Sequence, residues 1–330
     1  MLTFITTYKC TSACRSCCFQ CNPKRKEQLT VDEMKHYTDE CVKAYDSLQV
    51  MVLTGGESFI YGSKLEEILR HAKSYGLMTR VVTNGYWAKS YDIAYRKLGK
   101  LIDAGLTEIN FSTGDDHLEF VPVETIKNAT LASLSHNLTV SINVESGDDR
   151  RFSSKYLLND TDLHEYILKG KLLIMNGIWI PYNCETESSG NITPKKYISL
   201  DSFSKCHNLF GGITIDPVHR MIACCGISAK NSKYLDLGDV RKHSIKNLYE
   251  EQFNDFVKIW LATEGAHKIM NFISDFTIVD PHYKREHSCC VCEKIFCNEQ
   301  NLQILRNNYK QIYSSILLKY YIINKKESIQ

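Results

Sequence analysis

Residues 2–21 read LTFITTYKCTSACRSCCFQC, a short hydrophobic segment that runs into a loop rich in cysteine. The apolar and β-branched residues at 2–7 predict a β-strand. Cys10, Cys14 and Cys17 follow with C-x3-C-x2-C spacing, which places three thiols on one short loop. Three protein thiolates leave one iron of a 4Fe–4S cluster without a protein ligand, unlike the four-cysteine clusters of ferredoxins. That iron can bind a small chelating ligand.

Two alternatives to this motif stay open. The same spacing recurs four residues later at Cys14, Cys18 and Cys21. We favour the earlier register because Cys10 follows the strand directly, and Cys18 and Cys21 are then small buried hydrophobic residues. Zinc also binds thiolates, but a structural zinc site usually needs a fourth Cys or His at matching spacing.

Strand and helix patterns alternate beyond the cysteine loop. Thr30 and Glu33 have the spacing of a capping box and predict a helix that ends near Tyr45. Further strands are predicted at 49–54, 77–83, 107–112, 138–144 and 178–182, with helices at 64–75, 91–104, 122–135 and 161–169. Such alternation indicates a parallel sheet covered by helices. The fold class is α/β, a partial (β/α)6 barrel with its active site at the carboxyl ends of the strands.

The alternation stops near residue 200. The later segments predict a hairpin at 212–216 and 220–224, a helix at 244–264, a loop rich in Cys and His, and a terminal helix at 299–322. We therefore expect three parts: the barrel in residues 1–200, a small module in 201–298, and a C-terminal helix in 299–330.

The chain has 330 residues and 14 cysteines, most of which fall into two groups. Adjacent pairs and two-residue gaps suit a metal or an iron–sulfur cluster in a reducing cytoplasm better than they suit disulfides. The net charge of +2 argues against electrostatically driven binding to nucleic acid. No apolar run approaches the ~20 residues that cross a bilayer, and the first residues form no signal peptide.

Several polar motifs fall at the predicted strand ends and carry a family resemblance. Together with the cysteine loop, the runs TGGES (54–58), TNGYW (83–87) and STGDDH (112–117) resemble the radical S-adenosylmethionine (SAM) superfamily. The resemblance implies that the backbone and carboxylate of the Gly-Gly-Glu motif receive the methionine amino group of SAM. The implied SAM-binding residues are Gly55, Gly56, Glu57, Thr83, Asn84, Ser112 and Asp115, with Asn143 as a weaker candidate. Asp116 is the alternative to Asp115, because the usual spacing of an acid after the serine is broken here.

The second cysteine group resembles the twitch type of extension, a shortened SPASM domain, in radical SAM enzymes that modify ribosomally made peptides. This resemblance implies an auxiliary 4Fe–4S cluster with ligands Cys206, Cys224, Cys289 and Cys292. Cys290 is an extra thiol that competes with Cys289 for this role. A zinc knuckle built from the same residues is the alternative reading.

Cys225 stands beside an implied cluster ligand and has no ligand role of its own. The runs CCFQC (17–21), ACCG (223–226), ATEGAHK (262–268) and SCCVCEKIF (288–296) are similar to YydG-type radical SAM peptide epimerases. That family implies that Cys225 returns a hydrogen atom after the deoxyadenosyl radical has taken a Cα hydrogen, which turns an L-residue into a D-residue. The implied partners are a ribosomally made precursor peptide and a low-potential electron donor, flavodoxin or ferredoxin.

Two other functions compete with epimerisation. A radical SAM enzyme with the same machinery could form thioether or carbon–carbon crosslinks in a peptide. The non-enzyme alternative is a cysteine-rich zinc protein. The bland reading of Cys225 is a buried bystander thiol.

Overall fold

The computed structural model describes residues 1–146, 150–179, 205–226 and 232–327. The chain forms two compact units, one made of Met1–Tyr182 with Ile215–His219 and the other of Asn183–Thr214 with Arg220–Gln330. The boundary expected near residue 200 lies outside the described residues, as does Cys184.

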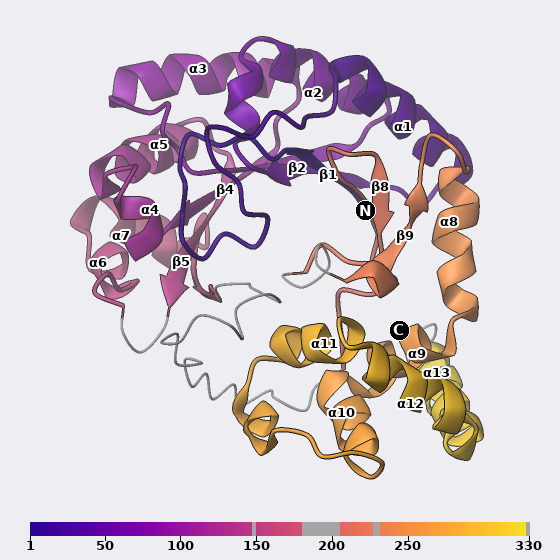
Figure 1. Cartoon of the computed structure of the whole chain (residues 1–330). Helices are drawn as coiled ribbons and strands as arrows, with labels where there is room; N and C mark the ends of the chain where they lie inside the picture. Colours follow the sequence, from indigo (N-terminus) through magenta and orange to yellow (C-terminus); the bar gives the residue numbers. More distant parts are fainter. Residues whose placement is uncertain (147–149, 180–204, 227–231, 328–330) are drawn as a thin grey trace. The chain divides into compact units, whose positions relative to one another are not determined.

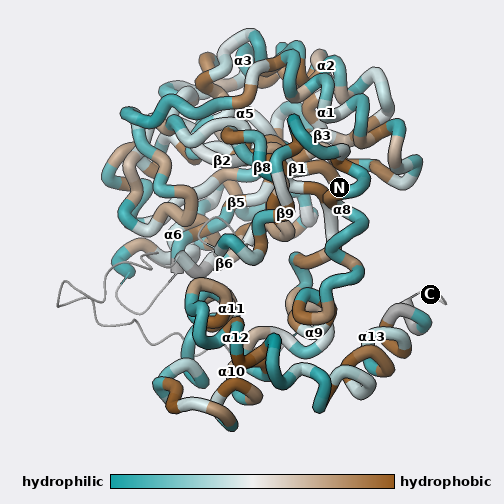
Figure 2. The backbone as a smooth tube through the Cα atoms, turned by 45° about the vertical axis from the view of Figure 1, so that its right-hand side comes forward, coloured by the Kyte–Doolittle hydropathy of each residue, from teal (hydrophilic) through white to brown (hydrophobic). Residues whose placement is uncertain are grey.

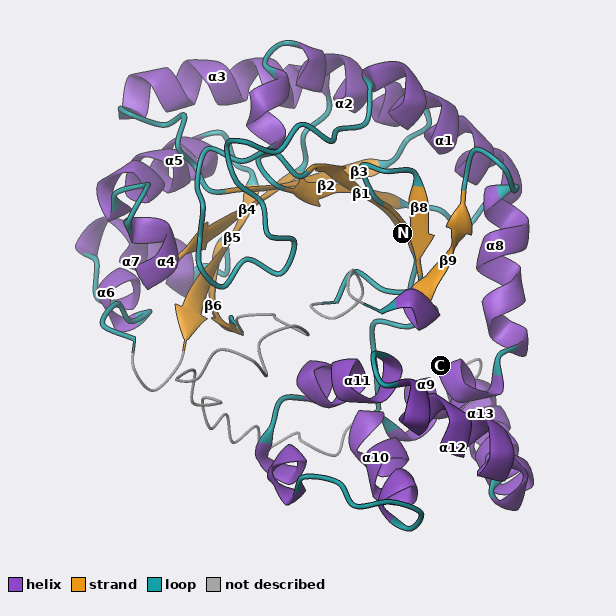
Figure 3. Cartoon of the chain, viewed as in Figure 1, coloured by secondary structure: helices purple, strands orange, loops and turns teal. Residues whose placement is uncertain are grey.

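The described part of the first unit holds a sheet of six parallel strands in the order β6-β5-β4-β3-β2-β1. The strands are β1 (Leu2–Thr7), β2 (Val50–Gly55), β3 (Met78–Thr83), β4 (Glu108–Thr113), β5 (Thr139–Ser146) and β6 (Leu172–Ile178). The helices that follow them lie along the convex side of the curved sheet (Figures 1 and 3). They include α1 (Val31–Ala44), α2 (Lys64–Ser74), α3 (Tyr91–Ala104), α5 (Val123–Ser135) and α7 (Thr161–Leu168). The predicted partial barrel is confirmed.

The two faces of this sheet differ in chemistry. The register places Phe4, Leu53, Val81 and Ile109 side by side on neighbouring strands, and all four are fully buried. On the other face of β4, residues such as Ser112 are half-buried. In the hydropathy view of Figure 2, hydrophobic and hydrophilic residues alternate along the outer helices. On β4, the period of two therefore directs the apolar Ile109 toward the helices and the polar Ser112 toward the open face.

Short helices and local signals complete this unit. Thr30 and Glu33 form the predicted capping box at the start of α1. Short helices η1 (Ser58–Tyr61), α4 (Asp115–Leu118) and α6 (Lys155–Leu158) lie in the loops after β2, β4 and β5.

The last predicted strand was placed too late. It was expected at 178–182, but β6 spans Leu172–Ile178, and residues 180–182 lie outside the described part. Helix α7 ends at Leu168, and Gly170 adopts a φ of 66° while its N–H donates to the carbonyl of Ile167. This glycine stop lets the chain enter the sheet directly, so the apolar run at 172–175 pairs with β5.

The second unit holds a small hairpin and several helices. Strands β8 (Arg220–Ile222) and β9 (Asp236–Asp239) pair antiparallel, and the predicted segments at 212–216 and 220–224 are strands β7 (Ile213–Ile215) and β8. The helical elements are η3 (Lys233–Leu235), α8 (Ile245–Glu251), η4 (Gln252–Asn254), α9 (Phe256–Glu264), α10 (Ala266–Ser274), η5 (Pro281–Arg285), α11 (Ser288–Phe296), α12 (Glu299–Asn308), η6 (Tyr309–Gln311) and α13 (Tyr313–Glu327).

Three predictions for this unit were wrong in detail, and capping side chains account for two of them. The helix expected at 244–264 breaks where Asp255 accepts hydrogen bonds from the N–H groups of Val257 and Lys258. The expected Cys- and His-rich loop contains α10 and α11, and His287 caps the start of α11. The terminal helix is split into α12 and α13. None of the helices in the described ranges has the length and apolar character needed to span a bilayer.

Candidate active site

The first cysteine loop begins at the end of β1 and is closed by backbone hydrogen bonds. The N–H of Cys10 donates to the carbonyl of Asn22 at 3.2 Å, and the N–H of Asn22 donates to Tyr8 at 3.3 Å. The N–H of Ser12 lies 3.4 Å from Cys10 Sγ, and that of Cys21 lies 3.4 Å from Cys17 Sγ. Backbone donors of this kind stabilise a thiolate or a sulfur bound to iron.

The structure brings the three predicted ligand thiols near one another. Burial raises the pKa of Cys10 to about 11, and the charges of Glu57 and Cys17 act in the same direction. Burial also raises the pKa of Cys14, and the charges of Cys17 and Cys10 act in the same direction. Cys21 is buried, with an exposed fraction of 4%.

No set of three or more His, Cys, Asp or Glu side chains in the described ranges is gathered closely enough to hold a single metal ion. The cysteine ligands of a cubane cluster each bind a different iron, so they need no common centre of that kind.

The Gly-Gly-Glu motif packs directly on the residue before the first cysteine. The N–H of Gly56 donates to Thr7 O at 2.6 Å, and the N–H of Glu57 donates to Lys9 O at 3.0 Å. A Cβ on Gly56 would lie 2.0 Å from the Lys9 carbonyl oxygen. Gly55 adopts a φ of 114°, a conformation that favours glycine. Both glycines are therefore required for the close approach of the β2 loop to the cysteine loop.

Glu57 is fully buried and is engaged by protein donors. Its carboxylate accepts hydrogen bonds from Phe59 N at 2.9 Å, Asn84 N at 2.9 Å and the Thr83 hydroxyl at 2.9 and 3.0 Å. Burial raises the pKa of Glu57 to about 7, and these donors oppose the shift. The structure thus shows Glu57 and Thr83 bracing the β2 and β3 loops. This role was not predicted from the motif.

Asn84 connects the end of β3 to the cysteine loop. Its Nδ2 donates to Thr11 Oγ1 and Ser12 Oγ, both at 3.0 Å, and lies 3.7 Å from Cys10 Sγ. Its Oδ1 accepts the N–H of Tyr86 at 3.1 Å. Asn84 therefore holds the start of the cysteine loop from the neighbouring strand.

Ser112 and Asn143 are paired neighbours on β4 and β5, and both lie half-buried on the open face of the sheet. The Asn143 amide lies over Gly177 of β6, where an added Cβ would approach its Oδ1 to 2.3 Å. The two residues predicted to face a ligand are thus adjacent at the carboxyl end of the sheet.

Asp115 and Asp116 have different partners. The Asp115 carboxylate accepts the N–H groups of Arg151 at 2.7 Å and Phe152 at 2.8 Å, so it anchors the loop after β5. Asp116 is buried and accepts the N–H of Ser16 at 2.7 Å. Of the two acids, Asp116 contacts the cysteine loop and Asp115 contacts the loop after β5.

The second unit gathers another set of thiols. A Cβ added at Gly226 would lie 3.4 Å from Cys224 Sγ and 4.0 Å from Cys289 Sγ, so these two sulfurs are neighbours. The pKa of Cys224 is raised by burial and by the nearby Cys206, Cys225 and Cys289. Cys292 lies one helical turn after Cys289 on α11 and is buried.

Two further thiols border this set. Cys225 is an exposed residue. Partial desolvation of its thiol raises its pKa, and the charge of Cys206 acts in the same direction. Burial raises the pKa of Cys290 to about 12, and the charges of Glu286 and Cys289 act in the same direction. The charge of Cys289 raises the pKa of Cys224.

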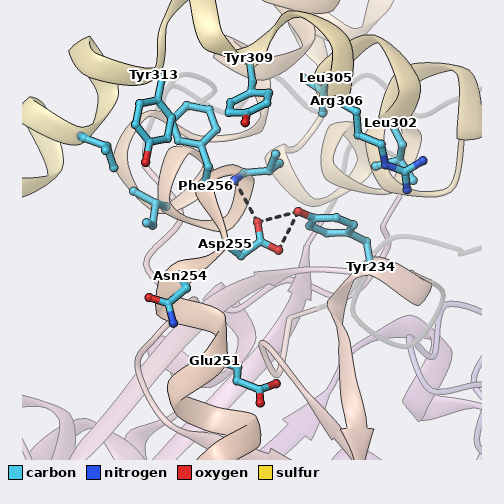
Figure 4. Close-up of a pocket in the computed structure, with 13 residues that line it drawn as sticks. Tyr234, Glu251, Asn254, Asp255, Phe256, Leu302, Leu305, Arg306, Tyr309 and Tyr313 are labelled. Atoms are coloured by element: carbon cyan, nitrogen blue, oxygen red, sulfur yellow. Dashed lines mark hydrogen bonds between the residues drawn. The ribbon is translucent and has the colours of Figure 1, made fainter.

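A pocket of about 500 Å³ also lies in the second unit, between η3, α9, α12 and α13 (Figure 4). Its wall combines aromatic and aliphatic side chains with charged ones such as Arg306, and Phe256 packs on Tyr309 and Tyr313. Asp255 is already engaged there: it accepts the Tyr234 hydroxyl at 2.6 and 2.8 Å and lies 2.7 Å from Lys258 Nζ. This acid stabilises the helix packing around the pocket.

Comparison with known proteins gives the class of this site. Residues 4–130 match the family model of the radical SAM superfamily, so this part of the chain is similar to radical SAM proteins. The class implies SAM and a 4Fe–4S cluster. The thiol loop with its backbone donors and the glycine contact beside it fit that group. The zinc-protein alternative is not supported.

Among individual proteins, the chain is similar to the putative peptide biosynthesis protein YydG of Bacillus subtilis strain 168. The two are 22% identical over 310 residues, which cover 93% of this chain and 95% of YydG. The fold is also similar to native anSMEcpe with bound AdoMet and Cp18Cys peptide, with a TM-score of 0.54 and 10% identity over 98% of this chain and 99% of that one. A histidine-tagged form of anSMEcpe with bound AdoMet gives a TM-score of 0.53 and 9% identity over 96% of this chain and 97% of that one.

Proposed function

We propose that this radical SAM enzyme converts L-residues of a ribosomally made precursor peptide into D-residues. A peptide substrate is supported by the similarity to YydG, which is named for peptide biosynthesis and matches nearly the whole chain. The observation that carries the epimerase assignment is Cys225, an exposed cysteine beside Cys224 and its neighbouring thiols.

The proposed site residues divide into two ligand sets. Cys10, Cys14 and Cys17 would hold the SAM-binding 4Fe–4S cluster. The residues that would line the SAM site are Gly55, Gly56, Glu57, Thr83, Asn84, Ser112, Asp115 and Asn143. Cys206, Cys224, Cys289 and Cys292 would hold an auxiliary 4Fe–4S cluster in a twitch-like module within residues 201–298. Residues 1–200 would form the barrel domain, with a C-terminal helical part in 299–330.

The cluster and SAM, when bound, supply a 5′-deoxyadenosyl radical that takes one Cα hydrogen from the peptide. Cys225 then donates the hydrogen atom of its S–H bond to the opposite face of Cα. The Cα–H bond broken on one face is replaced by one on the other, so the peptide's atoms are unchanged in number. The Cys225 sulfur needs one electron and one proton to return to the thiol.

The electrons would come from a low-potential donor, flavodoxin or ferredoxin. Thiolate-bound clusters also fit a reducing, cytoplasmic setting. We propose no nucleic-acid partner and no membrane partner.

The test is the reaction of the reconstituted enzyme with its precursor peptide in deuterated water, followed by mass spectrometry and chiral amino-acid analysis. Epimerisation adds one deuterium per inverted centre, because the thiol hydrogen exchanges with solvent. A crosslinking enzyme would instead remove two hydrogens without deuterium uptake, and this result would refute epimerisation.

The matched variants are Cys225→Ala and Cys297→Ala, which both remove an exposed cysteine of the second unit. We expect C225A to form 5′-deoxyadenosine but no D-residue, and C297A to retain both activities. Undiminished D-residue formation by C225A would exclude Cys225 as the hydrogen donor.

A further inference from the structure

A buried group of three charged side chains lies beside the first cysteine loop. Arg150 Nη1 is 2.8 Å from Asp116 Oδ1, and Arg150 Nη2 contacts Glu145 Oε1. The side chains of Asp116 and Glu145 are fully buried, and that of Arg150 is 5% exposed. We call these three residues the buried ionic group.

The sequence builds this group at the carboxyl ends of β4 and β5. Gly114 has a φ of 135°, and an added Cβ would lie 2.2 Å from Glu145 Cβ, so only glycine lets the two strand ends approach this closely. The N–H of Asp116 donates to Glu145 Oε2 at 2.9 Å. Arg150 directly precedes the residues whose N–H groups bind Asp115, which fixes its loop.

Ser16 links the buried ionic group to the cysteine loop. It lies between Cys14 and Cys17, and its backbone N–H donates to Asp116 Oδ2 at 2.7 Å. Arg150 Nη2 is 3.3 Å from Ser16 Oγ. The charges of Asp116 and Glu145 also act on the Cys14 thiol. The group is therefore coupled to the loop by hydrogen bonds and by its electric field.

The buried charges do not cancel. Within the buried ionic group, as far as the structure describes it, two carboxylates face one guanidinium, so these three side chains sum to a net charge of −1. Arg15 approaches Asp116 Oδ1 at 3.4 Å, but its side chain is 72% exposed, so solvent screens its contribution. A fixed negative charge at a buried position disfavours the addition of an electron nearby.

We propose that the buried ionic group positions the cysteine loop and sets the reduction potential of the 4Fe–4S cluster held there. This inference rests on the proposed function only for the ligand set Cys10, Cys14 and Cys17. Asp116, Glu145 and Arg150 act through the loop and its field, so they are positioning residues. The potential of an iron–sulfur cluster depends on net charge, hydrogen bonds to its ligands and solvent exposure, and this group supplies two of these influences.

The proposal predicts that different substitutions in the buried ionic group shift the midpoint potential of the cluster in opposite directions. Asp116→Asn and Glu145→Gln remove a negative charge, so the midpoint potential should rise. Arg150→Met removes the positive charge, so the potential should fall, and Arg150→Lys should return it toward the wild-type value. We expect the ratio of reduced to oxidised cluster at a fixed potential to change about tenfold, which equals about 59 mV for a one-electron couple.

The measurement is an anaerobic redox titration followed by electron paramagnetic resonance, with the SAM-binding cluster identified by the change of its signal when SAM is added. Iron content and circular dichroism report whether each variant is folded and loaded. Glu108→Gln is the matched control, because Glu108 lies at the other end of β4 and pairs with Arg80 at 2.8 Å. Its potential should equal that of the wild type.

Opposite shifts of the midpoint potential in E145Q and R150M support the proposal. Both variants retain Asp116 and its hydrogen bond from Ser16, so they still test the proposal if D116N loses its iron. Shifts of the same sign, or no shift, overturn it. A wild-type protein that binds no iron through Cys10, Cys14 and Cys17 would instead refute the proposed ligand set, which separates the two failures.

Discussion

Replacing Gly56 with alanine should disrupt the junction between the β2 loop and the cysteine loop. The added Cβ would lie 2.0 Å from the carbonyl oxygen of Lys9 and 2.7 Å from its carbonyl carbon. Both are backbone atoms, so rotation of a side chain cannot relieve the overlap. One of the two loops must move.

The size of the effect follows from the contacts that such a movement breaks. The hydrogen bonds from Gly56 N to Thr7 O and from Glu57 N to Lys9 O would be stretched or lost. Each contributes about 1 kcal/mol, and overpacking of a rigid site costs about 1–3 kcal/mol more. We expect Gly56→Ala to lower the free energy of unfolding by about 3–5 kcal/mol.

Urea denaturation of the apoprotein under anaerobic conditions, followed by circular dichroism, measures this change. Gly62→Ala is the control: Gly62 has a φ of 60° but no atom within 4 Å of an added Cβ. G62A should lower the free energy of unfolding only by the cost of placing alanine in the left-handed region, about 1–2 kcal/mol. If G56A loses no more stability than G62A, the steric reasoning is refuted.

Three further results are expected. Asn84→Ala should release iron to a chelator faster than the control Asn110→Ala. Asn84 binds the cysteine loop, whereas Asn110 Oδ1 has no hydrogen-bond partner in the described ranges. Equal rates of iron release would argue against a role of Asn84 in holding the loop. Gly114→Ala should destabilise the fold and weaken iron retention, since its Cβ would overlap Glu145, and wild-type thermal stability would contradict this. Burial works to raise the pKa of Asp255, but Lys258 and Tyr234 outweigh it and hold that pKa below its usual value. The carboxylate therefore stabilises the fold above about pH 4 and this contribution is lost at lower pH. Thermal melts should show that Asp255→Asn is destabilised at pH 7 and approaches the wild type as pH falls below about 4, whereas a constant difference would count against the assignment.

Local sequence signals predicted the elements of the first unit well. Helix α3 was expected at 91–104 and spans Tyr91–Ala104, because Ser90 caps its start and Gly105 ends it. The signals failed where a single residue redirects the chain. Gly170 starts β6 early, and Asp255 begins a new helix inside an apparently continuous pattern.

The sequence predicted where the site residues lie along the strands, but it did not predict which side chains they contact. The motif residues do lie at the strand ends, but no sequence pattern indicated that Glu57 accepts bonds from Thr83 and Asn84. The missed residues are Ser16, Glu145 and Arg150. The contact between Ser16 and Arg150 joins residues 134 positions apart, and no local pattern encodes such a pairing. The doublet of Asp115 and Asp116 was the available signal, and only the structure separates their roles.

The Lys9 carbonyl binds the Glu57 N–H, lies against Gly56 and directly precedes Cys10. One peptide group is thus shared by the thiol motif and the glycine motif. Chimeras with a relative should therefore exchange residues 7–10 and 55–57 as a matched pair, because a graft of either segment alone would join two loops shaped for different neighbours.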